Sequence, residues 1–350
     1  FNVAGYDLLA ASTVSNLRFD ATGTVAAAGG GSKTINALAI DSTAGAVTVT
    51  GPGSDTLVLA AGALLSTGAA ANNTALTGFA GITTATNNEY VVFVTNNQFT
   101  LGSPLTTSAA ALTKSGAGVL VLNGLTGNTY AGGTFFNQGL IEASALGDLG
   151  SGNLNFFGGG LRWATGATFD ISARTVVLGT GGATFDTNGN NVAFANALGS
   201  GAGTLTKDGV GVLTLNAVSA LTGGTNVNAG TLALGVSAAI GSGALSLTNN
   251  GTLALGAGTG AANQTVSQLS GASTSSIVGG DAVASVLTVD QSTASTFAGN
   301  LGGAGANQNN FGLTKTGVGS LTLSGATLSY TGPTVVNGGT LNLAGSTSAV

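Results

Sequence analysis

The chain has 350 residues, a net charge of −5 and a pI near 4.3, and only 5% of its residues are charged. Glycine contributes 61 residues, and cysteine, methionine and histidine are absent. An ordinary globular chain has about 7% glycine and about 25% charged residues. The composition therefore excludes disulfides, thiolate metal sites and imidazole-based catalysis. The seven basic residues are dispersed, so we expect no binding to nucleic acid.

Pairs of apolar residues two positions apart recur in the N-terminal part. They are Leu17/Phe19, Leu38/Ile40 and Leu57/Leu59, with a nearly constant step from one pair to the next. Residues two apart in a strand share one face, so each pair places two apolar side chains on the same side of a strand. A constant step of about 20 residues predicts a β-solenoid. A sandwich or barrel, the alternative, would reverse direction at each hairpin and would not need this step.

One phrase occurs three times in the rest of the chain, at 112–143, 205–234 and 313–343. Its skeleton is LTKxGxGxLxL, a short loop, then GGT or GPT, then NxGxL. The apolar pairs continue through these copies, for example as Leu213/Leu215 and Leu232/Leu234. We predict an all-β chain, a parallel β-helix with about 20 residues and one apolar core layer per coil, in which residues 1–350 form a single elongated domain.

The phrase resembles the autotransporter-associated β-strand repeat, also called the passenger-associated repeat, of large secreted bacterial surface proteins. The first copy retains GNTYAGGT at 127–134, whereas the second has Leu221 where the family has tyrosine and the third has Pro333 in place of the second glycine. The segment SNLRFDATGTV at 15–25 is similar to the opening strand of the cassette that often carries the repeat. The resemblance implies a right-handed parallel β-helix that is extracellular and displayed on the bacterial cell surface. It implies no particular chemistry.

Carboxylates are the only remaining catalytic groups. Asp20 and Asp41 are separated by one such step of the repeat, so on a solenoid they are expected to stack at strand ends on adjacent coils. A glycosidase needs two facing carboxylates, and a β-helix lyase or glycosidase is the alternative to a non-catalytic protein. Two solvated turn carboxylates explain the same spacing. We expect no catalytic residues and no enzyme.

A metal site has one set of candidates. Asp186, Asn188 and Asn190 offer oxygen ligands at alternate positions, as a calcium loop does. The stretch lacks the sixth-position glycine and the later glutamate of such a loop. An Asx-rich turn is the other interpretation, and we expect neither a metal nor a cofactor.

Two further features have two interpretations each. Lys114, Lys207 and Lys315 recur at one point of the phrase, either as a row that binds acidic glycans or as solvated charges that discourage edge pairing. Phe135, Phe136, Phe156 and Phe157 form two adjacent pairs that lie one coil apart. One member of each pair is expected to form an outward ladder, a platform for a sugar or a partner, or the rings stack in the core.

The sequence predicts a structural or adhesive surface protein. It contains no basic leader and no uninterrupted apolar run long enough to span a bilayer, so we expect a mature product or an excised segment without membrane insertion. The third phrase ends seven residues before the last residue, which leaves little sequence for a cap. Uncapped solenoid ends favour pairing with another copy, so a homo-oligomer or a head-to-tail extracellular filament is predicted, with surface glycans as further partners.

Overall fold

The computed structural model describes residues 16–20, 23–26, 31–85, 88–125, 127–199, 201–325 and 327–344. These residues form a parallel β-solenoid of about 14 turns with about 22 residues per turn. The all-β solenoid prediction is thus confirmed. Individual turns are longer than the predicted step where a strand lengthens, as between Lys33 and its register partner Leu57, a span that contains the ten-residue strand Lys33–Ser42. By contacts the chain divides into two compact units, Phe1–Ala167 and Thr168–Val350. A single elongated domain stays a prediction.

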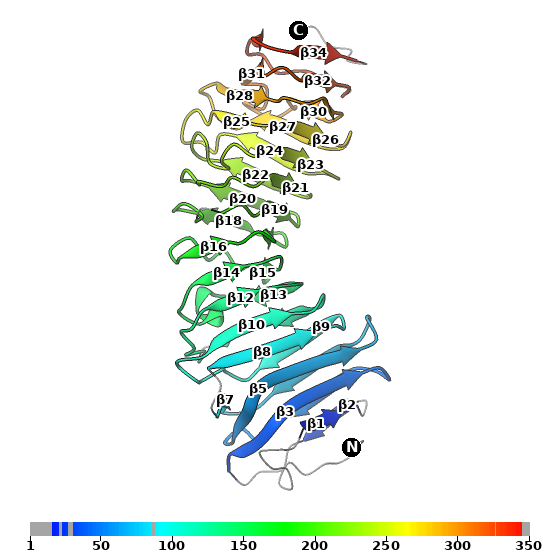
Figure 1. The fold of residues 1–350 in the computed structure, drawn as a ribbon, viewed down its shortest axis with the longest axis vertical. Coiled ribbons are helices and arrows are strands. Elements are labelled where there is room, and N and C mark those ends of the chain that lie inside the picture. Colours follow the sequence, from blue (N-terminus) through cyan, green and yellow to red (C-terminus); the bar gives the residue numbers. More distant parts are fainter. Residues whose placement is uncertain are drawn as a thin grey trace. The chain divides into compact units, whose positions relative to one another are not determined.

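The first unit consists of two series of parallel strands stacked coil upon coil, which Figure 1 shows from β1 upward in blue to green. One sheet runs β1-β3-β5-β8-β10-β12-β14, with β7 beside β5, and the other runs β2-β4-β6-β9-β11-β13-β15. The elements are β1 Asn16–Phe19, β2 Gly23–Ala26, β3 Lys33–Ser42, β4 Val47–Thr50, β5 Thr56–Gly68, β6 Asn73–Thr77, β7 Gly81–Thr84, β8 Glu89–Val94, β9 Gln98–Gly102, β10 Ala111–Ser115, β11 Val119–Val121, β12 Thr134–Phe136, β13 Leu140–Ala143, the 3-10 helix η2 Leu146–Leu149, β14 Leu154–Phe156 and β15 Gly160–Trp163.

The second unit has three series of parallel strands. They run β17-β19-β21-β23-β26-β29-β32-β34, β18-β20-β22-β24-β27-β30 and β25-β28-β31-β33. The strands are β16 Val176–Leu178, β17 Ala183–Asp186, β18 Asn191–Phe194, β19 Leu205–Asp208, β20 Val212–Leu215, β21 Thr225–Val227, β22 Thr231–Leu234, β23 Leu245–Leu247, β24 Thr252–Leu255, β25 Gln264–Val266, β26 Leu269–Gly271, β27 Ser276–Gly279, β28 Ser285–Asp290, β29 Ser295–Phe297, β30 Asn300–Leu301, β31 Phe311–Thr316, β32 Ser320–Leu323, β33 Thr334–Val336 and β34 Thr340–Leu343.

The apolar pairs of the repeats form the core in register. Leu213 pairs with Leu232, and Leu232 with Leu253. All three are fully buried, because alternate residues of each strand point inward and every coil places them above the previous pair. The predicted alignment of Leu17 and Phe19 with Leu38 and Ile40 is also confirmed.

The predicted second step of the N-terminal series, from Leu38/Ile40 to Leu57/Leu59, is wrong. Leu57 and Leu59 pair with Lys33 and Ile35, and Leu38 pairs with Leu64 instead. The register of β3 with β5 shifts between Ile35 and Ala37, since β5 is 13 residues long and bulges at Gly62, whose φ is +66°. A bulge inserts extra residues into one strand, and a prediction that assumes a constant step between apolar pairs does not include them. No helix in the described ranges is long and apolar enough to cross a membrane.

Candidate functional site

The three repeat lysines are buried at the same point of the repeat, in strands of three different sheets. Lys114, Lys207 and Lys315 have exposed fractions of 1%, 0% and 0%, so the prediction that they are solvated is wrong. Each lies two residues after a buried leucine on the same strand, and residues two apart share a face. The strand alternation in LTK therefore indicated that the lysine faces the core with the leucine. The sequence interpretation instead followed the general preference of lysine for solvent.

Each buried ammonium donates to three backbone carbonyls. The Nζ atom of Lys207 lies 2.8, 2.6 and 3.1 Å from the carbonyl oxygens of Asp208, Gly209 and Ala229. The first two carbonyls belong to the turn that follows the lysine, and the third belongs to the turn one coil further. The equivalent acceptors are Ser115, Gly116 and Gln138 for Lys114, and Thr316, Gly317 and Gly338 for Lys315. We call these three arrangements the lysine caps.

Two glycines of the phrase shape each lysine cap. Gly209 and Gly230 have φ values of +67° and +64°, a conformation that glycine adopts at no steric cost. A Cβ atom on Gly230 would lie 2.4 Å from the carbonyl oxygen of Gly211 and 2.9 Å from the Nζ of Lys207. The phrase KxG followed by NxG therefore encodes two stacked turns whose carbonyls surround one ammonium.

Burial shifts the titration of these amines. It lowers the pKa of Lys114 to about 7. It also lowers the pKa of Lys207, to about 8, against the opposing effect of the Asp186 and Asp208 charges. Three carbonyl acceptors match the three N–H donors of an ammonium, whereas a neutral amine has only two. The geometry of the lysine cap thus favours the charged ammonium and opposes the lowering of the lysine pKa by burial.

Other coils place a buried amide in a comparable turn. The Nδ2 atom of Asn96 lies 3.1 Å from the carbonyl oxygen of Asn72, and the Nε2 atom of Gln264 lies 2.7 Å from that of Thr265. Both side chains are at most 2% exposed. Buried carbonyls need hydrogen-bond donors. Lysine side chains supply these donors in some coils and amide side chains in others, so both have a structural role.

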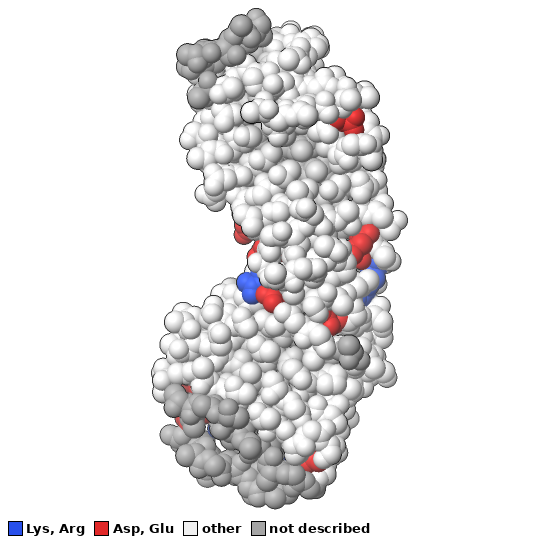
Figure 2. Space-filling model, turned by 180° about the vertical axis from the view of Figure 1, so that it is seen from behind, with Lys and Arg blue, Asp and Glu red and all other residues white. Residues whose placement is uncertain are grey.

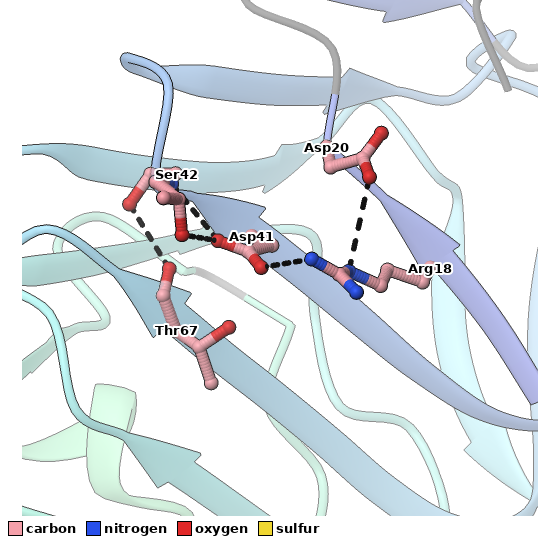
Figure 3. A network of polar contacts seen from close by, with 6 residues as sticks. Arg18, Asp20, Asp41, Ser42 and Thr67 are labelled. Carbon is pink, nitrogen blue, oxygen red and sulfur yellow. Dashed lines mark hydrogen bonds and ion pairs between the residues drawn. The ribbon is translucent and has the colours of Figure 1, made fainter. Parts of the chain in front are cut away.

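An ion network lies where β1 and β3 end, and Figure 3 shows it closely. Arg18 contacts Asp41 at 2.5 Å and Asp20 at 3.9 Å. The predicted neighbourhood of Asp20 and Asp41 is therefore present, with Arg18 between their carboxylates, which the sequence interpretation missed. On the same strand end, the Ser42 hydroxyl donates to the carbonyl of Thr67.

The charge state of this network argues against acid catalysis there. The Thr43 hydroxyl and backbone N–H donate to Asp41. The Thr43 hydroxyl is the main cause of the lowered pKa of Asp41, and Arg18 acts in the same direction. A glycosidase needs one carboxyl group that keeps its proton. The network instead contains an ionised Asp41 bound by a guanidinium.

Most other carboxylates accept hydrogen bonds within turns. Asp148 accepts from the backbone N–H groups of Ser144 and Ala145 at 2.8 and 3.0 Å. Asp170 accepts from the backbone N–H of Ser172 in its own turn and from that of Ala195 one coil further. Among the residues the structure describes, no group of three or more acidic, histidine or cysteine residues could hold a metal ion. Figure 2 shows few charged residues on a largely uncharged surface, with red and blue atoms adjacent in places.

The three calcium candidates take part in a turn. Asp186 Oδ1 accepts from the backbone N–H of Asn188 at 2.9 Å, which is the Asx-turn arrangement. Asn188 has a φ of +48°. Asn190 is 8% exposed and its side-chain amide donates to the carbonyl of Thr187 at 2.8 Å. These contacts account for the residue types without an ion.

The four phenylalanines divide between the core and the surface. Phe136 and Phe156 are buried and stack at 4.2 Å between ring centroids. Phe135 is half-buried and Phe157 is 46% exposed, and their parallel rings lie 6.4 Å apart. Each of the two sequence interpretations therefore describes one of these ring pairs. What the outer pair binds stays a prediction.

An apolar groove lies on the outer face of β1, β3, β5 and β8. Its volume is about 350 Å³. Its lining includes the small side chains of Ala39 and Ala63 and the larger ones of Leu65, Val91 and Phe93, which are 37–41% exposed. Contiguous exposed apolar surface on a soluble protein often marks a contact site. Nothing in the sequence pattern singled out this groove.

Comparison with known proteins gives one match. The family model described as passenger-associated-transport-repeat matches residues 112–143, 205–234 and 313–343, about a quarter of the chain. Neither the curated proteins nor the solved structures include a match. The chain thus carries three passenger-associated-transport repeats, and each coincides with one lysine cap.

Proposed function

We propose that this chain is a stretch of an exported β-solenoid, displayed outside the bacterial cell, which acts as a non-catalytic scaffold. The coincidence of the three family repeats with the three lysine caps carries the proposal. In each repeat the lysine is buried and binds carbonyls of two successive coils, so the repeat stabilises the stacking of coils. The small charge and absent thiols fit a protein that depends on hydrogen-bonded layers for its stability.

The absence of a recognisable catalytic arrangement in the described ranges supports the non-catalytic part. Arg18 binds Asp20 and Asp41, and the carboxylates of Asp148 and Asp170 accept hydrogen bonds from backbone N–H groups. A carboxylate used in this manner stabilises a turn, since charge-assisted hydrogen bonds to backbone N–H groups are strong. A lyase or glycosidase is the alternative.

Surface labelling of the native cells tests the location. Antibodies against the purified folded chain should label intact cells, and external protease should remove the label while a cytoplasmic marker stays intact. Labelling that appears only after permeabilisation would overturn the proposal. Incubation with neutral and acidic polysaccharides tests catalysis. Release of new reducing or unsaturated ends that is lost in Asp41→Asn would establish the enzyme alternative.

An adhesive role is a second candidate, favoured by the apolar groove. Uncharged polysaccharides suit a surface of aromatic and aliphatic side chains with few charges, because sugar rings stack on apolar faces. The variant Phe93→Ser should weaken binding of immobilised neutral glycans, whereas Val218→Ser, at a site 59% exposed in the second unit, should not. Equal binding by both variants would exclude the groove as the contact.

A further inference from the structure

The folded chain buries all four of its lysines. They are Lys33, Lys114, Lys207 and Lys315, with exposed fractions of 8%, 1%, 0% and 0%. Lysine is a residue that proteins almost never bury completely unless its ammonium is paired. The described ranges include every lysine of the chain, so the folded surface presents no lysine side chain apart from the small exposed part of Lys33.

The other charged residue types are not buried as a class. The side chain of Arg18 is 54% exposed and that of Arg162 is 23% exposed. Glu89 and Asp290 are exposed carboxylates. Burial of a complete residue type is therefore particular to lysine, and the low total charge of the chain does not explain it.

The backbone beside each lysine is protected as well as its side chain. Lys33 begins β3, and the three repeat lysines lie in β10, β19 and β31. Each of these four strands pairs with another strand on both edges. Proteases need an accessible, extended segment around the bond they cut, and exposed loop tips are their preferred sites. Cleavage beside Lys207 therefore requires both ladders of β19 to open, together with the lysine cap.

We propose that burial of its lysines makes the folded chain resistant to lysine-directed proteases and to amine-modifying reagents outside the cell. This inference rests on the proposed function as an exported scaffold, and it gives the lysine caps a second role. A cap lysine joins successive coils, and the same contacts withhold the side chain that such a protease must bind. Attack then depends on the small population of molecules in which neighbouring coils have opened.

The resistance is specific to attack at lysine. Val210 and Val318 are 68% and 84% exposed in the turns that follow two of the repeat lysines, and Phe157 is 46% exposed. A protease that cuts beside apolar residues thus finds side chains of its preferred type on the surface. The removal of antibody label from cells should use such a protease, because a lysine-directed one is expected to leave the folded chain intact.

Acetylation of amines tests the accessibility of the lysines. The purified full chain is treated with acetic anhydride at pH 8, and each lysine is then quantified by peptide mass spectrometry. At this pH the Lys114 amine is mainly uncharged and reactive, because burial lowers its pKa to about 7. Acetylation of all four lysines should nevertheless be at least about 100-fold slower in the folded chain than in urea, since core segments open rarely.

The variant Val210→Lys supplies the matched control. It places an exposed lysine in the turn that forms part of the Lys207 cap. The introduced amine at position 210 should react at a similar rate in the folded chain and in urea, while Lys207 in the same molecule stays protected. Acetylation of Lys114, Lys207 or Lys315 in the folded chain at the rate of position 210 would overturn the inference.

Digestion with a lysine-directed endoprotease over a urea series tests the resistance itself. The full chain should stay intact without urea, and fragments that end at its lysines should appear together with the loss of the β-sheet circular dichroism signal. Cleavage at any of the four lysines while this signal is still native would overturn the inference. Both experiments use the purified chain, so their failure leaves the scaffold function standing. Antibody labelling that needs permeabilised cells would instead refute the scaffold function.

Discussion

The Nζ atom of Lys207 lies 3.1 Å from the carbonyl oxygen of Ala229, one coil further along the chain. The same ammonium binds Asp208 and Gly209 in its own turn. The cap therefore joins two successive layers through side-chain hydrogen bonds, in addition to the backbone ladder between β19 and β21. Its contribution can be measured locally, at the two turns it connects.

Replacing Lys207 with methionine should weaken these two turns. Methionine fills similar space but removes the ammonium from the carbonyls of Gly209 and Ala229, and from that of Asp208, which keeps the backbone N–H of Thr187 as a donor. An unsatisfied buried acceptor costs about 1–3 kcal/mol. Relief of the buried charge offsets part of this loss, so we expect a net cost of about 2 kcal/mol. Amide exchange near Gly209 and Asn228 should accelerate accordingly, whereas Thr206→Met, on the outer face of the same strand, should change it little. Equal acceleration would contradict the cap.

Alanine at Gly230 should be more damaging than alanine at Gly258. Both glycines have positive φ values, +64° and +81°, so both variants share the backbone cost of about 1–2 kcal/mol for that conformation. Only Gly230 has neighbours within 3 Å of the new Cβ atom, and Gly258 has none within 4 Å. The difference between their urea midpoints isolates crowding of the lysine cap. Similar midpoints would show that the lysine cap accommodates the added Cβ atom without a loss of stability.

The stability that Lys114 confers should rise with pH. Its pKa is lowered by burial to about 7, from 10.5 as the ordinary value. Between these two values the unfolded state binds more protons than the folded state, so the free energy of unfolding increases with pH across this window. Below about pH 7 both states hold the proton and the dependence disappears. Urea titrations at pH 6 and pH 9 should show a larger increase for the parent than for Lys114→Met.

The two faces of β20 should respond differently to a carboxylate. Leu215 is 2% exposed, and Thr214, on the opposite face, is only half-buried. Leu215→Asp buries an unpaired charge and should cost more than about 3 kcal/mol, whereas Thr214→Asp should cost about 1 kcal/mol or less. Thermal melting followed by circular dichroism measures both. Comparable losses would contradict the assigned faces.

The repeats made most of the fold predictable. Where the loops are short, the period-two pairs such as Leu213/Leu215 identify both the strand and its inner face, and the step between pairs identifies the register. The prediction from a constant step was wrong at Leu57, because β5 contains extra residues around Gly62, which form a bulge and shift its register with β3. A bulge depends on backbone conformation at one residue, which an apolar pattern does not record.

The polar interior was harder to predict than the apolar one. Lys114 follows Leu112 with strand spacing, yet its residue type suggested solvent, since isolated lysine is rarely buried. Only the arrangement of carbonyls in two adjacent turns makes its burial favourable. Likewise the spacing of Asp20 and Asp41 predicted their neighbourhood, but the position of Arg18 between them depends on side-chain conformation.

The lysine caps also bear on how the array responds to mechanical pulling. A force on the last strand, β34, would peel coils one at a time, because each coil contacts mainly the next. The first cap on that path is Lys315, which holds Gly338 of the departing coil. Lys207 and then Lys114 follow several coils further along the path. Extension should therefore slow at the layers that Lys315, Lys207 and Lys114 join, and also at those that the buried amides of Gln264 and Asn96 join.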